Sequence, residues 1–358
     1  MYLSLIFALA TLPVTISHLL NMSRFLYPIV LFSSLTMHTL SSNALALEVR
    51  VYSGRHYNTD RIVYKQFSER TGIRVRLMET SGISLVERIK REGINTKADV
   101  IILVDAARIS NAANAGLFQP INSRRLDRDV PAHYRDPARR WYGLTRRVRV
   151  VIVNPEIVNL STIKDYSDLS NPSLKGKLCL RNRKNVYNQS LVADQLVMHG
   201  ELTTKAWLQG MTSNVSQNYF PGDVALIRAV AQGKCGASVV NHYYIARMRA
   251  GVSGQRDQKL ADKVGVITPN PAHVNISAAA VSKYAQNRSE AIKLIEFLAS
   301  LDGSSGMAAP TYEYPLKGLG QSPQLKALGT FTPGKVTISQ LGSSNARAVE
   351  LMTQAGWQ

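Results

Sequence analysis

The chain has 358 residues, of which 43 are Lys or Arg, 24 are Asp or Glu and 45% are hydrophobic. This composition excludes a disordered chain and a collagen-like repeat, and two cysteines are too few for a disulfide-stapled miniprotein. Because a single core stops growing near this length, we expect two compact lobes with a cleft between them.

The first 46 residues carry one charged side chain, Arg24, among long apolar runs. They end in Asn-Ala-Leu-Ala, with small residues where a signal peptidase requires them, so residues 1–46 are predicted to be a secretory signal peptide. Met22 begins a complete signal of its own and is the favoured true start. A retained membrane anchor is the alternative, but proline and polar residues break each run below about 18 apolar residues.

The first lobe is predicted from short apolar strands that alternate with amphipathic helices. Strands are expected at 48–52, 73–78 and 100–104, with one helix between Asp60 and Gly72 and another ending near Gly93. This β-α-β-α-β series is typical of an α/β fold with Rossmann-like lobes.

The pattern restarts after residue 148, which predicts a crossing into a second α/β lobe. Further strands are expected at 148–153, 178–180, 236–240 and 264–267, and further helices near 190–199, 223–232 and 243–250. A return crossing is expected over Val264–Ala280, before a helix at Glu290–Leu301. Two crossings between lobes make a hinge.

These crossings divide the chain into five parts. After the signal peptide we expect 47–148 as the first part of lobe 1, 149–268 as lobe 2, 269–305 as the return to lobe 1, and 306–358 as a C-terminal segment that packs on lobe 2 and is helical from about Asn345.

A basic surplus remains after the signal peptide is removed, with 42 basic and 24 acidic side chains. Nucleic acid, anionic lipid and an anionic ligand all suit this charge, and nucleic acid is the weakest of them for an exported protein. Residues 124–149 hold nine arginines, most of them expected on a solvated face. Arg146, Arg147 and Arg149 lead into Val150–Val153 and are expected on or beside a strand.

Catalytic motifs are missing from the sequence. It contains no G-x-S-x-G elbow, P-loop, G-x-G-x-x-G after a strand, H-E-x-x-H or C-x-x-C. Their absence weakens the interpretation as an enzyme without excluding it. Cys179 and Cys235 allow one disulfide in an exported chain, and two buried free thiols are the equal alternative.

Tyrosines follow predicted strands at three places: Tyr57, Tyr187, and the pair Tyr243 and Tyr244. The carboxyl ends of strands are where open α/β sheets bind ligands. Adjacent tyrosines converge only where the chain turns from a strand into a helix, which is the position predicted for 241–244. Phenolate oxygens are hard donors suited to Fe(III). Because four phenolates around Fe(III) leave a charge of −1, a nearby arginine is expected, with Arg147 and Arg247 as candidates.

Four segments, taken together and in order, resemble the periplasmic ferric-iron-binding proteins of bacterial ABC importers, above all their cyanobacterial branch. They are Val51–Asp60, Ala98–Asp105 with 115–119, Val186–Ser190 and Asn241–Tyr244. The resemblance implies a two-lobed periplasmic-binding-protein fold of type II that closes over one Fe(III), with Fe(II) left open. It also implies a periplasmic location, an ABC permease of the inner membrane as partner, and a monomer that does not bind nucleic acid.

The resemblance further implies roles for single residues. Tyr57, Tyr187, Tyr243 and Tyr244 match the ligands of the family, and His56 matches a histidine that ligates or stands aside. Asn241, Arg147 and Arg247 would surround the metal without binding it. Three alternatives stay open: the same fold binding an oxyanion or a polyamine, an exported metal-dependent hydrolase, and a role at a membrane surface.

Overall fold

The computed structural model describes residues 47–55 and 58–358. The predicted signal peptide 1–46 and the predicted site residues His56 and Tyr57 lie outside the described residues. No helix in the described part of the chain is long and apolar enough to cross a membrane.

The first lobe is built on a sheet with the strand order β2-β1-β3-β8-β5. The first three strands are parallel, and β8 runs antiparallel to both β3 and β5. Their bounds are β1 Glu48–Ser53, β2 Arg74–Glu79, β3 Val100–Val104, β5 Tyr142–Val153 and β8 Val274–Ser282, with a short β4 Phe118–Gln119 beside β8. Every residue of β3 and β8 is buried, as expected for strands covered on both faces.

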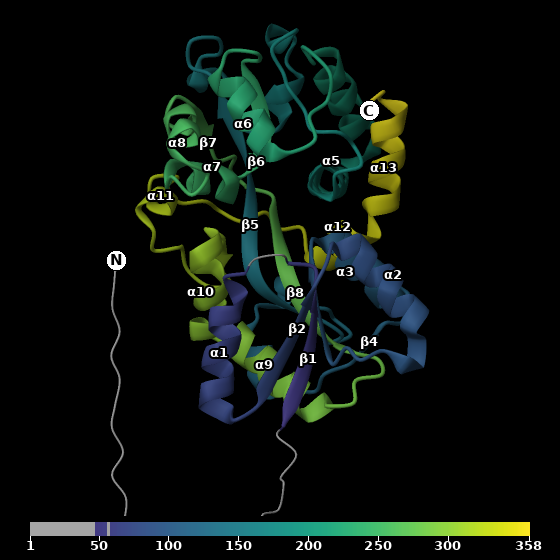
Figure 1. The fold of residues 1–358 in the computed structure, drawn as a ribbon. Helices are drawn as coiled ribbons and strands as arrows, with labels where there is room; N and C mark the ends of the chain where they lie inside the picture. Colours follow the sequence, from purple (N-terminus) through teal and green to yellow (C-terminus); the bar gives the residue numbers. More distant parts are fainter. Residues whose placement is uncertain (1–46, 56–57) are drawn as a thin grey trace, which may run out of the picture. The chain divides into compact units, whose positions relative to one another are not determined.

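Helices cover this sheet in the lower half of Figure 1, with α1 and α10 to the left of the strands and α2 and α3 to the right. Their bounds are α1 Asp60–Thr71, α2 Gly82–Glu92, α3 Ala106–Asn114, α4 Arg124–Asp129, α9 Arg288–Ala299 and α10 Leu301–Ala308. The helix predicted between Asp60 and Gly72 is confirmed, because Gly72 ends α1 in the left-handed conformation that glycine adopts without strain.

The second lobe uses the other half of β5, which pairs with β6 (Ala237–Asn241) and β7 (Gly265–Ile267). Its helices are α5 Val186–Ser213, α6 Asp223–Ala231, α7 His242–Arg249 and α8 Gln255–Asp262. Because β5 pairs with β8 up to Val148 and with β6 from Arg149 onward, this one strand carries the chain from the first sheet into the second. The crossing predicted near residue 148 is therefore observed.

The return segment runs beside this crossing. The Arg149 backbone N–H donates to the carbonyl of His273 at 3.2 Å. The Tyr166 hydroxyl donates to the Arg149 carbonyl at 2.7 Å and accepts from the His273 N–H at 3.1 Å. The two crossing segments are thus tied together where the two sheets meet.

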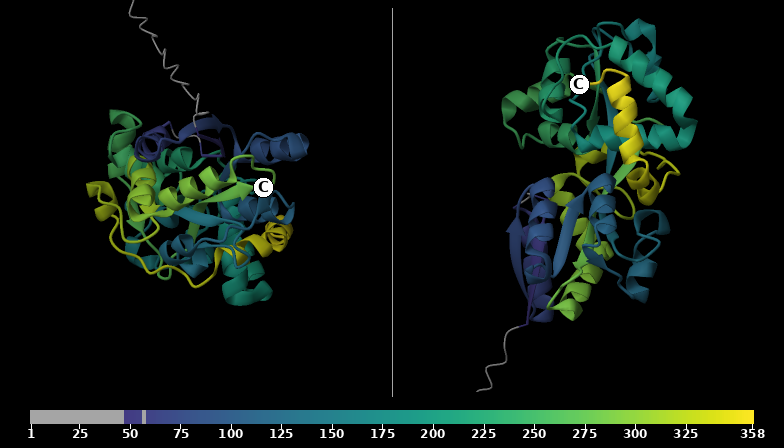
Figure 2. Two further views of the ribbon diagram at one scale, coloured as in Figure 1. Left: turned by 90° about the horizontal axis from the view of Figure 1, so that it is seen from below. Right: turned by 90° about the vertical axis from the view of Figure 1, so that its right-hand side faces the viewer.

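The tail contacts both halves of the molecule. A short strand, β9 (Tyr314–Pro315), pairs with β5 at Thr145 and Arg146, so residues up to 315 stay with the first sheet. Three helices follow, α11 Pro323–Lys326, α12 Ile338–Ser343 and α13 Asn345–Gln354. Helix α12 lies against α3 and α5, and α13 lies along α5 (Figure 2). The division into lobes drawn from the sequence stays a proposal.

Two expected elements differ from the structure. Residues 178–180 form no strand, and Leu178 makes only isolated bridges, to Val215 and Ala237. Helix α5 extends from Val186 to Ser213, much longer than predicted, with a non-helical break at Gly200, where φ is 77°. The predicted range 190–199 covers the part of the helix that ends at this break, and a second helical piece follows it.

Cys179 and Cys235 form a disulfide, with their Cα atoms 5.8 Å apart. It fastens the bridging segment 178–181 to the start of β6. Because it closes a loop of 56 residues, reduction should lower the free energy of unfolding by about 2–4 kcal/mol. Urea unfolding with and without dithiothreitol measures this change. The double variant Cys179→Ser/Cys235→Ser should have the free energy of unfolding of the reduced protein, both with and without dithiothreitol. A reduced protein as stable as the oxidised one would contradict the prediction.

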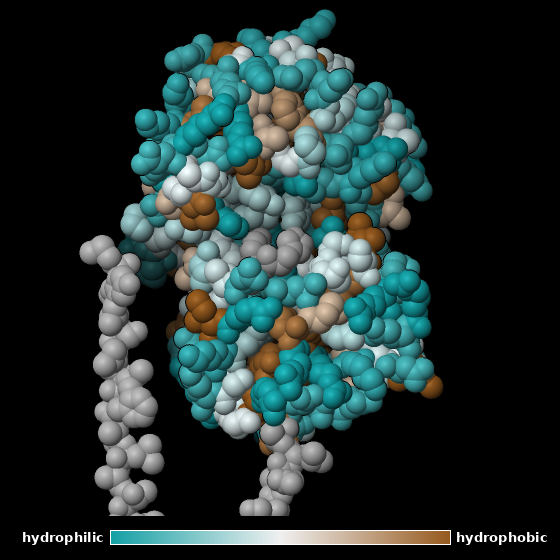
Figure 3. All heavy atoms as spheres, viewed as in Figure 1, coloured by the Kyte–Doolittle hydropathy of each residue, from teal (hydrophilic) through white to brown (hydrophobic). Residues whose placement is uncertain are grey.

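The face drawn in Figure 3 is largely hydrophilic, with apolar residues scattered over it. Exposed large apolar side chains, such as Ile94, Leu202 and Leu301, come from separate elements. A scatter of single apolar residues is ordinary for a protein surface and needs no partner to cover it.

Candidate metal centre

Tyr243 and Tyr244 lie where β6 ends and α7 begins. Their rings are 4.3 Å apart between centroids and tilted by 37°, so the adjacent side chains lie together at this turn, as the sequence predicted. Tyr243 is fully buried and Tyr244 half-buried. The side-chain amide of Asn241, the last residue of β6, donates to the Tyr243 hydroxyl at 3.4 Å. The turn therefore holds two phenol groups at one end of the second sheet.

Tyr187 joins this pair from the first turn of α5. The Asn185 side chain caps that helix by accepting from the Tyr187 N–H at 3.1 Å, which fixes the backbone of the tyrosine. The Arg147 guanidinium carbon lies 5.9 Å from the ring centroid of Tyr187 and 5.9 Å from that of Tyr243. Arg147 comes from β5 and is 1% exposed. The structure thus brings three predicted ligands together around one predicted arginine.

A second arginine, Arg181, also faces Tyr187, and the sequence did not predict it. The Arg181 guanidinium carbon lies 5.7 Å from the Tyr187 ring centroid. Arg181 follows the bridging segment that the disulfide fastens, and no motif in the sequence marks it. Two cations therefore border the three described tyrosines.

Asp223 holds the arginines of the second lobe in place. Its carboxylate accepts from Arg149 and from Arg181 at 2.9 Å each and from the backbone N–H of Asn241 at 2.8 Å. Arg149 in turn donates to the Asn188 side chain at 2.9 Å, next to Tyr187. One buried carboxylate therefore links the start of α5 to the start of α7, which are the two elements that carry the tyrosines.

The segment that leads to the fourth predicted ligand, Tyr57, is described up to Arg55. Arg55 is 1% exposed and pairs with Asp60 at 2.9 Å and with Glu313 at 2.8 Å. Glu313 also accepts from Arg147 at 2.9 Å. Arg55, the last described residue before His56 and Tyr57, is thus linked through Glu313 to Arg147, which borders the other tyrosines.

Glu313 is fully buried, and burial by itself raises a carboxyl pKa. The Arg55 and Arg147 guanidiniums outweigh burial and hold the pKa of Glu313 at about 2, below its ordinary value of 4.5. Because the folded-state pKa is depressed, the stability that Glu313 contributes is present above pH 4.5 and is lost as the pH falls toward 2.

Acid should therefore destabilise the iron-free protein partly through Glu313. The variant Glu313→Gln has no carboxylate to protonate, so its free energy of unfolding should fall less between pH 5 and 3 than that of the wild type. The full linkage contribution is about 3 kcal/mol. Urea unfolding at several pH values measures it, and parallel pH curves for the two proteins would contradict the prediction.

Two further residues flank the tyrosine pair in the sequence: Arg247, a predicted site residue, and His242, which is not one. Arg247 lies in the last turn of α7 and is half-buried. His242 is fully buried, its ring stacking on Tyr314 at 4.3 Å and its Nδ1 accepting from the Val148 N–H at 3.1 Å. Burial lowers the pKa of His242 to about 3, so its imidazole is neutral and serves packing at the crossing.

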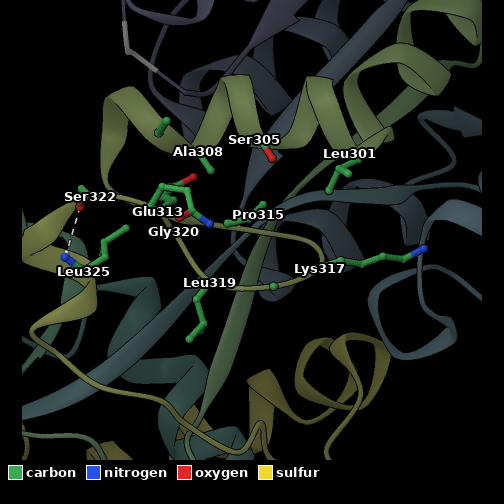
Figure 4. Close-up of a pocket in the computed structure, with 13 residues that line it drawn as sticks. Leu301, Ser305, Ala308, Glu313, Pro315, Lys317, Leu319, Gly320, Ser322 and Leu325 are labelled. Atoms are coloured by element: carbon green, nitrogen blue, oxygen red, sulfur yellow. Dashed lines mark hydrogen bonds between the residues drawn. The ribbon is translucent and has the colours of Figure 1, made fainter.

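Other donor groups do not compete with the tyrosines in the described residues. No three His, Cys, Asp or Glu side chains there are grouped so that they could hold a metal ion. A cavity of about 290 Å³ lies beside α10 and the loop after β9, and none of the predicted tyrosines lines it (Figure 4). In the described part of the chain, the candidate metal centre therefore rests on the phenol oxygens.

Comparisons with known proteins place this arrangement in a family. The family model described as bacterial extracellular solute-binding protein matches residues 95–332. Iron uptake protein A1 of Synechocystis sp. is 39% identical over 316 residues, covering 87% of this chain and 88% of that protein. The major ferric iron-binding protein of Neisseria meningitidis is 28% identical and covers 89% of this chain and 95% of its own length.

A solved structure also resembles this chain. A Trichodesmium protein called IdiA or FutA, solved in complex with iron and citrate ligands, is 39% identical, covers 87% of this chain and all of its own, and superimposes with a TM-score of 0.84. This likeness confirms the predicted two-lobed fold of type II. The chain belongs to the bacterial extracellular solute-binding proteins, and within them to the family of the iron uptake and ferric-iron-binding proteins that the sequence resembles.

Proposed function

We propose that this protein binds one Fe(III) through Tyr57, Tyr187, Tyr243 and Tyr244 and delivers it to an ABC permease of the inner membrane. The observation that carries the proposal is the convergence of Tyr187 and Tyr243, with Tyr244 beside them, on the Arg147 guanidinium. Relatives named as iron uptake and ferric iron-binding proteins support it. His56 is a fifth ligand or stands aside.

The charges around the tyrosines suit this cargo. Four phenolates on Fe(III) form a centre of net charge −1, and a buried anionic centre requires a nearby cation. Arg147 and Arg181 supply cations at the described tyrosine rings. An oxyanion site would not need tyrosines, so the gathering of Tyr187, Tyr243 and Tyr244 disfavours the alternative of a site built for a free oxyanion. A polyamine would require carboxylates in place of the phenols.

The protein acts, on this proposal, as a periplasmic carrier and not as an enzyme. The family described as extracellular solute-binding proteins and a relative named as an iron uptake protein support this role. We further propose that it works as a monomer, that residues 1–46 are the export signal, and that nucleic acid is not a partner.

Iron stoichiometry tests the proposal. The mature protein, residues 47–358, is loaded with excess ferric citrate, desalted and analysed for iron. We expect one iron per chain at pH 8 and progressive loss as the pH falls, because protons compete with Fe(III) for phenol oxygens whose ordinary pKa is about 10. Protein that retains no iron after desalting would contradict the proposal.

A further inference from the structure

Glu313 reaches the centre from a distant part of the chain. It follows Tyr312, whose φ of 60° turns the backbone sharply after the α10 region, and it precedes β9, which pairs with β5. Figure 4 shows it below α10, beside Pro315. The carboxylate is 0% exposed. A charge buried to this degree persists only when its partners compensate it.

Its partners come from β5 and from Arg55, which follows β1 by two residues. Oε2 accepts from Arg55 at 2.8 Å and from the Thr145 hydroxyl at 2.5 Å, and Oε1 accepts from Arg147 at 2.9 Å. The Ser277 hydroxyl accepts from both Arg55 and Arg147. Glu313 and Ser277 therefore fix the orientation of the Arg147 guanidinium.

The charges of this group balance. Arg55 and Arg147 contribute two positive charges, and Asp60 and Glu313 contribute two negative ones. The Arg147 guanidinium carbon lies 5.9 Å from the ring centroids of both Tyr187 and Tyr243. Because charges interact more strongly inside a protein than in water, the field that Arg147 exerts on those rings depends on whether its carboxylate partner is present.

Glu313 is not one of the proposed iron ligands. We propose that Glu313 is a positioning residue that sets the reduction potential of the bound iron by orienting Arg147 and offsetting its charge. This inference rests on the proposed function. Reduction adds one electron, supplied in the test by dithionite, and converts an Fe(III) centre of charge −1 into an Fe(II) centre of charge −2. More positive surroundings stabilise the more negative Fe(II) centre and therefore raise the reduction potential.

Removal of the Glu313 charge and removal of the Arg147 charge should therefore shift the reduction potential in opposite directions. Glu313→Gln keeps the size of the side chain and removes its charge, so the midpoint potential should rise. Arg147→Gln removes the cation, so the potential should fall. We expect each change to alter the Fe(II)/Fe(III) ratio at a fixed potential at least tenfold, which is about 59 mV for one electron.

Controls separate this effect from general destabilisation. Glu313→Asp keeps the charge and should leave the potential close to that of the wild type. Asp257→Asn removes a carboxylate that pairs with Arg228 between α6 and α8, at 2.8 and 2.7 Å, and should leave the potential unchanged. A merely structural role for Glu313 would change stability without moving the potential in opposite directions.

The experiment is a redox titration of the iron-loaded mature proteins, monitored through the visible band of the ferric form. Potentials of Glu313→Gln and Arg147→Gln that equal the wild-type potential would overturn the inference. If Glu313→Gln fails to fold, Arg147→Gln still tests the inference, because an unchanged reduction potential in that variant would also overturn it. A wild-type protein that shows no iron-dependent band would instead contradict the proposed function itself.

Discussion

Replacement of Tyr243 and Tyr244 together by phenylalanine is expected to lower the affinity for Fe(III) by at least about a thousandfold, equivalent to about 4 kcal/mol. The change removes two of the four proposed phenolate donors, and the neighbouring amide of Asn241 is not an anionic ligand. The rings remain, so the packing of Tyr243 against Tyr244 and His242 is kept. The loss should therefore appear in binding and not in folding.

A competition titration against citrate measures this loss, and thermal unfolding of the iron-free proteins checks that the fold is intact. Tyr284→Phe is the matched control, because Tyr284 is 40% exposed and lies after β8, on the first sheet. It should bind iron as the wild type does. Full affinity in the double variant would exclude the tyrosine pair as ligands.

Asp223→Ala is expected to cost about 3–5 kcal/mol of folding free energy, because it leaves buried arginine charge without its partner. Arg149 is 2% exposed and pairs with Asp223 at 2.9 Å, and Arg181 pairs with the other carboxylate oxygen. The loss also frees the backbone N–H of Asn241. Iron binding should weaken as well, since Asp223 connects the elements that present Tyr187 and Tyr243.

Asp257→Ala provides the comparison for that variant. Asp257 also receives two hydrogen bonds from an arginine, but Arg228 is 49% exposed and stays solvated when its partner is removed. We expect a cost of about 1 kcal/mol or less there. Urea unfolding of both variants measures the difference, and similar losses for the two would show that burial of the arginine charge does not determine the cost.

Much of the architecture could be predicted because its signals are local. The alternation of β1, α1 and β2 follows from periodicity and from Gly72 as a helix stop. The turn at Asn241 follows from a strand that gives way to a helical pattern, and it explains why adjacent tyrosines lie together. Arg147 was expected on or beside a strand because it precedes a continuous apolar run, and β5 carries it into the buried region between the sheets.

The residues that organise the centre could not be predicted, because their partners are remote in sequence. Glu313 meets Arg55 across 258 positions and Arg147 across 166. Asp223 opens a helix, where an acidic residue is ordinary and carries no sign of two arginine partners. The disulfide stayed undecided because pairing depends on a distance between segments, which sequence spacing does not supply.

The most direct test of the account is a visible absorption titration of the metal-stripped mature protein with ferric citrate. The account predicts a new broad band, from phenolate-to-iron charge transfer, that grows linearly and saturates at one iron per chain. A protein that stays colourless while the iron remains on citrate would contradict the tyrosinate centre.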